Sequence, residues 1–271
     1  MTLFCCYISW DVAPEIFSVG QFSIRYYGMF MVIAFLMSSL VFYRILKREG
    51  ESLFLLSVTA NAVFLGLLTG ARLGECIFYF PEYYLKNPLE IILPFRDGKY
   101  TGIGGLSSHG AAFVIPAFLF FTAKTVKKPA FWLIDRVCVT VPLAAFFIRL
   151  GNLMNSEIVG TETSLPWGFV FKQRCENFPR HPVQLYEAVC YLVVFFVIYR
   201  FYRKKQDTAG QGFITGLFLM LTFFPRSVLE IFKAPINEFD MYSFFSTGQY
   251  LSLFFAFAGV ALTAYKSKDS G

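Results

Sequence analysis

The 271-residue sequence contains few charged residues. Asp, Glu, Lys and Arg make up 15% of it, whereas soluble domains average about 25%. Hydrophobic residues make up 56%, and Phe alone occurs 35 times. A single soluble core of this size cannot bury so much apolar surface. This composition argues against a soluble globule, a nucleic-acid-binding protein and a disordered chain, and it favours an integral membrane protein.

The sequence also offers little for metal binding. It has only two histidines, His109 and His181, and its six cysteines form neither a CxxC pair nor another metal-ligand spacing. A His-rich zinc site needs more ligands than these. We therefore expect neither a metal nor a cofactor.

Apolar runs predict seven transmembrane helices in an all-α integral membrane protein. Each run is close to the about 20 residues that cross a hydrocarbon core of roughly 30 Å. Two sizeable outer loops, 82–105 and 151–183, separate some of the runs. Residues 1–271 are expected to form a single polytopic domain, with spans at about 26–43, 53–80, 106–123, 131–149, 184–201, 211–232 and 241–265.

Basic residues gather in alternate linkers and predict the orientation. The positive-inside rule makes the side with short, basic loops cytoplasmic. The N-terminus is then outside and the C-terminus cytoplasmic. The twelve basic residues that set this orientation are Arg44, Lys47, Arg48, Lys124, Lys127, Lys128, Arg200, Arg203, Lys204, Lys205, Lys266 and Lys268.

Charged residues inside the spans require a partner or a function, because a charge at a helix centre costs roughly 2.5–3.5 kcal/mol. Arg72 and Glu75 lie at the outer end of the second span. They could neutralise each other on one helix face, or Arg72 could belong to a headgroup pocket. Arg226 and Glu230, which follow Pro225, are spaced i,i+4. They could form a structural ion pair or line a polar cavity.

The second span also carries a stripe of small residues. Gly66, Gly70 and Gly74 recur every four residues in the segment GLLTGARLG. Small residues at this spacing let a neighbouring membrane helix approach closely. We therefore interpret the stripe as a helix-packing surface.

The segment RLGNLMNSEIVG, residues 149–160, concentrates polar groups at the outer end of the fourth span. Arg149 carries a planar guanidinium that matches a phosphate. Asn152 and Asn155 can donate hydrogen bonds to ester or glycerol oxygens. Gly151 permits a close backbone approach. The alternative is an ordinary polar helix terminus.

The two histidines also lie at outer ends of spans. His181 precedes Pro182 in RHPVQLYE and could be a structural residue at the start of the fifth span. His109 follows a glycine-rich loop in GIGGLSSHGAA and could cap a helix or act as a general base. Together with the arginines, these residues indicate a site for an anionic, amphipathic substrate, best matched by a lipid with a phosphate headgroup.

Several of these segments resemble one known family. RLGNLMNSEIVG and RHPVQLYE occur together with FSVGQFSIRYYG, GARLG, PRSVLEIFKAP and STGQYLS. In this order, along nearly the whole chain, they are similar to the prolipoprotein diacylglyceryl transferase family.

The resemblance implies a seven-span enzyme of the bacterial cytoplasmic (inner) membrane, with its active site towards the outer leaflet. It implies transfer of the diacylglyceryl group from phosphatidylglycerol to the lipobox cysteine of a prolipoprotein, the first step of lipoprotein maturation. The expected partners are thus phosphatidylglycerol, a lipobox peptide and membrane lipid, without nucleic acid or metal.

By position, the resemblance implies that Arg149 and Arg226 bind the headgroup phosphate, that His109 is the base, and that Tyr27 matches the family tyrosine. These four are the catalytic candidates. The substrate-binding candidates are Asn152, Asn155, Glu157, Gly160, Arg72, His181 and Glu230.

The sequence departs from the family pattern at Ile148, Leu153, Thr222 and Ala111, and these departures concern the shape of the site. Two other functions remain open. An anion or phospholipid transporter would also place arginines in the membrane, although along its depth. A non-catalytic lipid-binding scaffold would use the arginines but leave the histidines without a role.

Overall fold

The computed structural model describes residues 7–19, 22–78, 81–92, 95–96, 99–100, 108–205, 210–234 and 244–268. The chain divides into two compact units, which are described separately. Unit 1 comprises Met1–Phe42 and Asp135–Gly271, and unit 2 comprises Tyr43–Ile134.

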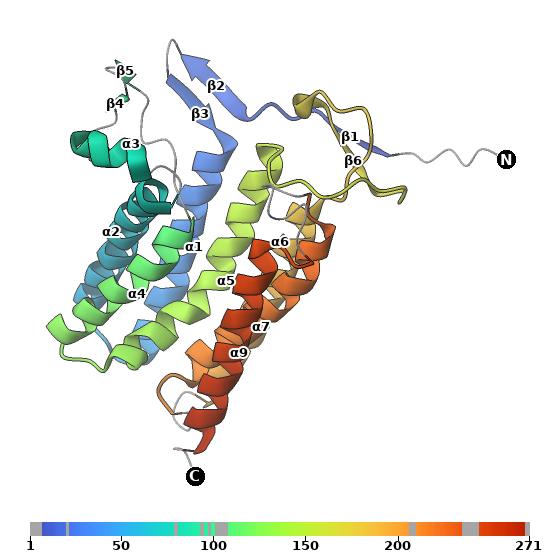
Figure 1. Cartoon of the computed structure of the whole chain (residues 1–271). Coiled ribbons are helices and arrows are strands. Elements are labelled where there is room, and N and C mark those ends of the chain that lie inside the picture. The colour runs from blue at the N-terminus through green and yellow to red at the C-terminus, as the bar shows by residue number, and fades with distance from the viewer. Residues whose placement is uncertain are drawn as a thin grey trace. The chain divides into compact units, whose positions relative to one another are not determined.

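Unit 1 is built mainly from long apolar helices. In Figure 1 they run along a common direction, with the strands of the unit beyond one end. A one-turn 3-10 helix, η3 (Glu230–Phe232), directly follows α7. The helices are α1 (Tyr26–Arg48, in this unit as far as Phe42), α5 (Ala130–Met154, from Asp135), α6 (Val183–Lys205), α7 (Phe213–Leu229) and α9 (Thr247–Lys268).

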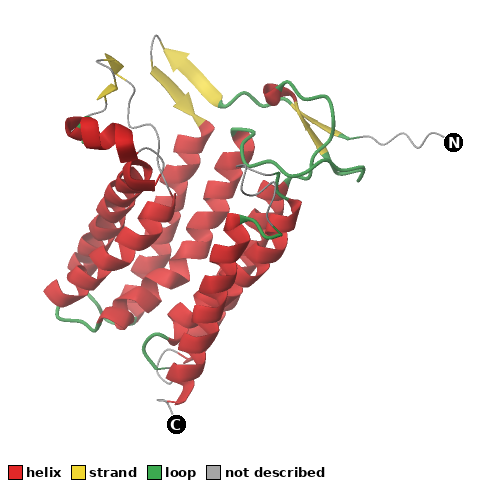
Figure 2. Cartoon of the chain, in the orientation of Figure 1, coloured by secondary structure: helices red, strands yellow, loops and turns green. Residues whose placement is uncertain are grey.

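Short strands accompany the helices of unit 1 and appear in yellow in Figure 2. Strand β1 (Ile8–Trp10) pairs in parallel with β6 (Phe169–Phe171), which the 3-10 helix η2 (Lys172–Arg174) follows. Strand β2 (Glu15–Val19) pairs antiparallel with β3 (Phe22–Arg25), which leads directly into α1. The all-α prediction did not include these strands, because two to five residues are too few to display an alternating pattern.

A small core joins the β1–β6 pair to the end of α5. Leu153, Val159, Phe169 and Phe171 are buried together, and Trp10 packs against them. The indole Nε1 of Trp10 donates a hydrogen bond of 3.2 Å to the carbonyl oxygen of Leu153. The segment that follows α5 is therefore anchored by apolar packing rather than left as a loose loop.

Unit 2 contains two long helices, α2 (Leu53–Phe78) and α4 (Ser108–Thr125). An added Cβ on Gly70 would lie 2.8 Å from the Cα of Ala111, and one on Gly110 would lie 2.6 Å from the Cα of Gly74. This close approach confirms the small-residue stripe as a packing surface. Shorter elements complete the unit: α3 (Pro81–Lys86), η1 (Pro88–Ile91), β4 (Phe95–Arg96) and β5 (Lys99–Tyr100).

Among the residues that the structure describes, six helical segments are long and apolar enough to cross a membrane: Tyr26–Arg48, Leu53–Gly74, Ala130–Met154, Val183–Lys204, Phe213–Phe232 and Gly248–Tyr265. They correspond to six of the seven predicted spans. The predicted third span coincides with α4, in which Phe113–Thr125 forms a shorter apolar helix. Helices α1 and α5 continue beyond the predicted ends at 43 and 149, because a charged residue at a span boundary does not end a helix.

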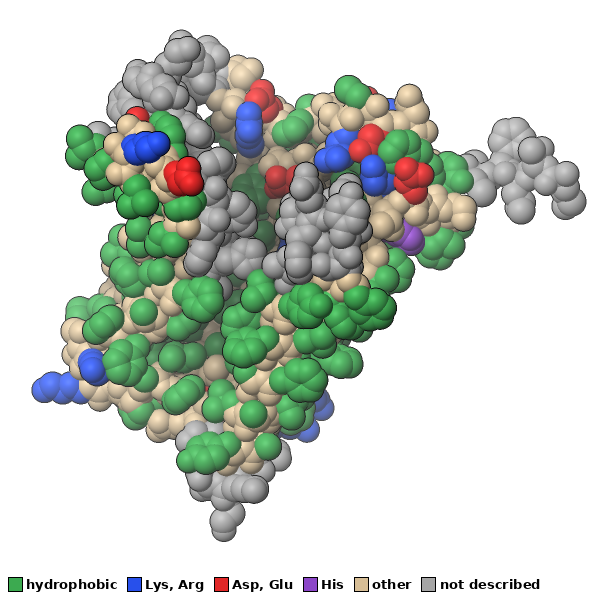
Figure 3. Space-filling view, in the orientation of Figure 1, with side chains coloured by type: hydrophobic (Ala, Val, Ile, Leu, Met, Phe, Trp, Pro, Cys, Tyr) green, Lys and Arg blue, Asp and Glu red, His purple; other side chains and the backbone are tan. Residues whose placement is uncertain are grey.

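The surfaces of the helices are apolar. Figure 3 shows hydrophobic side chains along the helices of each unit, with charged side chains at the helix ends. On α9, Phe254 is 66% exposed and Phe257 70% exposed. Such a surface is stable in lipid rather than in water, which agrees with a multi-pass membrane protein.

A buried carboxylate fixes the start of α7. Asp135 of α5 accepts hydrogen bonds from the backbone N–H groups of Gly212 (2.7 Å) and Thr215 (2.8 Å) and from the Thr215 hydroxyl (2.5 Å). The first N–H groups of a helix have no partner within the helix. Asp135 therefore caps α7 from another helix and holds the two together.

Candidate active site

The end of α5 turns the chain back on itself. The N–H of Glu157 donates to the carbonyl of Asn152, and the N–H of Ser156 donates to that of Leu153. Ser156 is in the left-handed region at φ 53°, so these two bonds form a Schellman motif. The turn brings the side chain of Glu157 back beside the last turn of α5.

A chain of polar side chains results. Arg149 Nη1 donates to Asn152 Oδ1 (3.0 Å), and Asn152 Nδ2 donates to Glu157 Oε1 (2.7 Å). Asn155 Nδ2 reaches the same carboxylate oxygen at 3.5 Å. Gln184 of α6 donates to the Glu157 carbonyl at 2.7 Å. Four of the predicted site residues, Arg149, Asn152, Asn155 and Glu157, thus form one network, in which Glu157 orients Asn152 and Asn152 in turn holds the guanidinium of Arg149.

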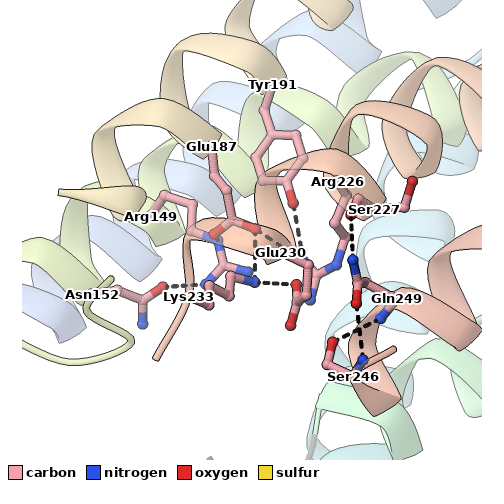
Figure 4. Close-up of polar contacts among 10 residues, drawn as sticks. All are labelled: Arg149, Asn152, Glu187, Tyr191, Arg226, Ser227, Glu230, Lys233, Ser246 and Gln249. Atoms are coloured by element: carbon pink, nitrogen blue, oxygen red, sulfur yellow. Dashed lines mark hydrogen bonds and ion pairs between the residues drawn. The ribbon is translucent and has the colours of Figure 1, made fainter. Parts of the chain in front are cut away.

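A second set of charged residues lies next to this network, drawn in Figure 4. Glu187, near the start of α6, is 0% exposed. Its Oε2 lies 2.8 Å from Arg149 Nε, and its Oε1 lies 3.6 Å from Arg226 Nη1 and 3.1 Å from Lys233 Nζ. One buried carboxylate therefore faces three cations. We call Arg149, Glu187, Arg226, Glu230 and Lys233 the ion-pair cluster.

The other members of the cluster come from the end of α7 and from η3. Lys233 Nζ lies 2.7 Å from Glu230 Oε2, and Arg226 Nη1 donates to the Tyr191 hydroxyl at 3.0 Å. Arg226 and Glu230 thus have partners on other segments, Glu187 and Tyr191 for Arg226 and Lys233 for Glu230, and the polar cavity stays a prediction. The three cations exceed the two carboxylates, so the cluster carries one net positive charge.

The sequence analysis did not select Glu187 or Lys233 as site residues. Glu187 offered a signal, because it is an isolated carboxylate in an apolar run. Lys233 offered a weaker signal: it lies in the segment PRSVLEIFKAP, but it follows the last predicted residue of a span, where lysine is common.

The start of α9 contacts the ion-pair cluster at Glu230. An added Cβ on Gly248 would collide with the Glu230 carboxylate, so the two groups are in close contact. Gln249 Nε2 approaches the carbonyl of Ser227 at 3.4 Å, and Gln249 and Ser246 are hydrogen-bonded to each other (Figure 4). Helix α9 is therefore attached to the end of α7 through polar groups.

Tyr27, in the first turn of α1, belongs to the same region. An added Cβ on Gly151 would lie 3.0 Å from Tyr27 Cδ2, which shows that the ring packs against α5 at that glycine. Tyr27 also interacts electrostatically with Glu157 and Arg149. Gly151 thus permits a close approach, as predicted, and the group that approaches it is the side chain of Tyr27.

Gly160 lies in a crowded backbone junction. Its N–H donates to the carbonyl of His181 at 3.0 Å, and it forms an antiparallel bridge with Lys233. An added Cβ would lie 2.5 Å from the His181 carbonyl oxygen and 2.7 Å from that of Phe232. Only glycine fits between these two backbones. The contacts of Gly160 are therefore those of a residue that positions its neighbours.

His181 lies outside the ion-pair cluster, in an aromatic group. Its Nδ1 is 3.2 Å from the Tyr186 hydroxyl, and its ring centroid is 5.1 Å from that of Phe232. The Trp167 indole donates to the same hydroxyl at 2.9 Å. Burial lowers the pKa of His181, which favours its neutral form.

Two of the candidates, Arg72 and His109, belong to unit 2. Arg72 donates to the carbonyl oxygens of Glu90 (2.5 Å) and Ile91 (2.9 Å), and its guanidinium lies over the Tyr84 ring. These contacts attach the segment after α2 to that helix. The side chains of Glu75 and His109 lie outside the described residues, although both positions belong to helices, α2 and α4.

The arrangement in unit 1 is suited to binding an anion. Planar guanidinium groups and an ammonium converge from α5, α7 and the residue after η3, in surroundings that exclude most water. Fixed cations in such a site stabilise negative charge on a bound group far more strongly than they would in water.

Comparisons with known proteins identify relatives over nearly the whole length. A family model described as prolipoprotein diacylglyceryl transferase matches residues 14–265. A phosphatidylglycerol–prolipoprotein diacylglyceryl transferase of Tolumonas auensis is 36% identical, covering 96% of this chain and 98% of that protein. Proteins of the same name from Bacteroides fragilis and Chloroherpeton thalassium are 37% and 36% identical, and they cover 96% and 97% of this chain and 96% of each relative.

Proposed function

Since the chain belongs to the prolipoprotein diacylglyceryl transferase family, we propose that it transfers the diacylglyceryl group of phosphatidylglycerol to the lipobox cysteine of a prolipoprotein. This is the first step of lipoprotein maturation. The proposal rests on the ion-pair cluster, which carries one net positive charge. Its side chains are largely buried at the ends of apolar helices. A lipid that carries a single phosphodiester charge would complement it.

The proposed reaction is a substitution at carbon. The thiolate of the lipobox cysteine attacks the glycerol carbon that bears the phosphate, so a C–S bond forms while the C–O bond breaks. Glycerol phosphate leaves with the electron pair of that bond. Its phosphate gains negative charge during the step, and Arg149 and Arg226 are positioned to stabilise this charge.

The thiol proton must go to a base, because the thiolate is the nucleophile. We assign this role to His109, since a histidine accepts protons near neutral pH. In the proposal Tyr27 completes the catalytic group. The substrate-binding residues are Asn152, Asn155, Glu157, Gly160, Arg72, His181 and Glu230. His109→Gln should remove the acidic limb of the pH–rate profile, and an unchanged limb would reject this base.

The proposed topology has seven spans in one polytopic domain of the cytoplasmic membrane. The N-terminus would be outside, the C-terminus inside, and the site towards the outer leaflet. Helix α6 supports this orientation, because Glu187 lies near its start and Arg200, Arg203 and Lys204 lie at its opposite end. By the positive-inside rule the basic end is cytoplasmic.

One assay separates this function from its alternatives. The purified protein is incubated in detergent with phosphatidylglycerol and a lipobox peptide, and the peptide mass is followed. Transfer adds the diacylglyceryl group to the peptide and releases glycerol phosphate. A scaffold would bind the lipid without product. A transporter would move lipid or anion across vesicles and leave the peptide unmodified, and either result would reject the proposal.

A further inference from the structure

We propose that Lys233 is a third phosphate-binding cation of this site and contacts the headgroup phosphate during transfer, alongside Arg149 and Arg226. The proposal rests on the proposed function. It assigns to substrate a residue that follows the last turn of the α7–η3 segment and that lies in the segment PRSVLEIFKAP without having been predicted as a site residue.

The first argument for this role of Lys233 is the charge balance of the ion-pair cluster. Arg149 and Arg226 together balance Glu187 and Glu230, so these four residues alone would be neutral. Lys233 supplies the surplus positive charge. In the part of the chain that the structure describes, Glu157, the further carboxylate beside the cluster, is hydrogen-bonded to Asn152 and Asn155 rather than paired with a cation. The phosphodiester of a phosphatidylglycerol headgroup carries one negative charge and would balance the charges of the five-residue cluster.

The backbone around Lys233 holds it in a defined place. The N–H of Ala234 donates to the Val159 carbonyl (3.2 Å), and the N–H of Thr161 donates to the Phe232 carbonyl (2.8 Å). Lys233 itself is extended, with φ −83° and ψ 143°, and is bridged to Gly160. Because these bonds fix the backbone of Lys233, only its side chain has to be ordered when a phosphate binds. This reduces the entropic cost of binding.

The side chain has a donor to spare. Lys233 is 5% exposed at its side chain, and its ammonium lies 3.1 Å from Glu187 and 2.7 Å from Glu230. An ammonium has three N–H donors, and these two contacts use two. The contact with Glu230 is a hydrogen bond and the contact with Glu187 is an ion pair, so in the proposal the remaining donor binds a phosphate oxygen while both contacts are kept. The contact would strengthen as the C–O bond breaks, because the leaving phosphate then gains charge.

The surroundings of Lys233 also make its charge sensitive to pH. The groups that face it are Glu187, Glu230, Arg226 and Arg149. Burial, followed by the two arginines, lowers the pKa of Lys233, although the two glutamates act in the opposite direction. Lys233 should therefore lose its proton at a lower pH than an exposed lysine, and transfer should decline with it.

The test compares Lys233→Met and Lys233→Arg with the wild type in the phosphatidylglycerol and lipobox-peptide assay. We expect Lys233→Met to lower kcat/KM about 10- to 100-fold, the range for one lost hydrogen bond to a charged group. Lys233→Arg should keep more activity than Lys233→Met and should shift the alkaline limb of the pH–rate profile to higher pH. Lys172→Met, at an exposed position of η2, is the matched control and should leave kcat/KM unchanged.

A double variant separates phosphate contact from charge balance. Lys233→Met combined with Glu230→Gln keeps the net charge of the cluster at one positive. Since the ammonium is then absent, transfer should stay at least as low as in Lys233→Met, and inhibition by glycerol phosphate should weaken in both. Recovery of transfer in the double variant, or wild-type kcat/KM in Lys233→Met, would overturn the proposal.

Failure of the proposed function gives a different pattern. If the wild type itself transfers nothing to the peptide, the proposed function fails whatever Lys233 does. Binding of glycerol phosphate to the wild type and to Lys233→Met then decides the role of Lys233 by itself. Equal affinity of the two proteins would exclude a phosphate contact.

Discussion

At the scale of single residues, the charged site depends on the buried carboxylate of Glu187. Three cations approach it, and two of them, Arg149 and Arg226, are the proposed phosphate ligands. Breaking one side of a buried ion pair commonly costs 3–5 kcal/mol, because the remaining charge is left without a partner. Glu187 therefore orients both arginines while leaving the site with a net positive charge.

Replacing either arginine by lysine tests this geometry. Arg149 contacts Glu187 through Nε and Asn152 through Nη1. The single ammonium of a lysine cannot make both contacts in the same geometry. We expect Arg149→Lys and Arg226→Lys each to lower kcat/KM by about 10-fold or more, with the alanine variants lower still. The measurement is peptide modification by purified, correctly inserted protein.

Arg200→Lys provides the matched control, because Arg200 is exposed at the far end of α6. It should have no effect on transfer. Near-normal activity in both Arg149→Lys and Arg226→Lys would mean that the site needs positive charge but not a planar fork.

His181 should make stability depend on pH. Its pKa is lowered by burial, so the folded protein takes up a proton less readily than the unfolded chain. The free energy of unfolding should therefore decrease as the pH falls below about 6.5, the ordinary value for histidine. His181→Gln should flatten this decrease in thermal unfolding between about pH 6.5 and pH 5. An equally steep decrease in the variant would assign the effect to another group.

At the scale of elements, the important contacts join helix ends to other helices. Asp135 of α5 caps α7, the end of α5 turns through Ser156, and the start of α9 contacts Glu230. Each contact satisfies backbone or side-chain polar groups that lipid could not satisfy. The site residues thus keep their places because the helices that carry them are joined at their ends.

Asp135→Ala should destabilise the protein without touching the ion-pair cluster. The loss of three hydrogen bonds at the start of α7 should lower the unfolding free energy by about 1–3 kcal/mol, in the range of a lost cap and buried unpaired donors. Thermal unfolding in detergent measures the change. Asp11→Asn, at an exposed position, should leave the midpoint unchanged. Equal midpoints for Asp135→Ala and the wild type would contradict the cap.

At the scale of the whole molecule, the pattern of apolar helices and basic ends sets the relation to the membrane. In the described part of the chain, six helical segments are long and apolar enough to cross it, and α4 contains a shorter apolar one. The basic residues follow alternate spans of the predicted order. The predicted odd number of spans and this alternation agree with the proposed orientation, in which the two termini would lie on opposite sides.

Cysteine labelling tests this topology. Single cysteines replace Lys127, after α4, and Lys172, in η2, in a background without the native cysteines. The two should react with a membrane-impermeant reagent from opposite sides, Lys172→Cys from outside and Lys127→Cys only after the cytoplasmic side is opened. Labelling of both from outside would rule out the seven-span arrangement.

The sequence by itself predicted the apolar helices and part of the site. Long apolar runs predict transmembrane helices, because a helix that crosses the bilayer needs about 20 predominantly apolar residues. Arg149, Asn152 and Glu157 lie within a few residues of one another, so helix spacing and one turn suffice to bring them together.

Only the tertiary structure decided which distant residues complete the site. Glu187 contacts both Arg149, 38 positions before it in the sequence, and Lys233, 46 positions after it. Asp135 caps a helix that begins at Phe213. The strands β1 and β6 likewise pair across most of the chain. The spacing of apolar residues predicts which side of a helix is shielded from water. It does not predict which residue pairs with a buried charge, because that depends on which helix ends pack together.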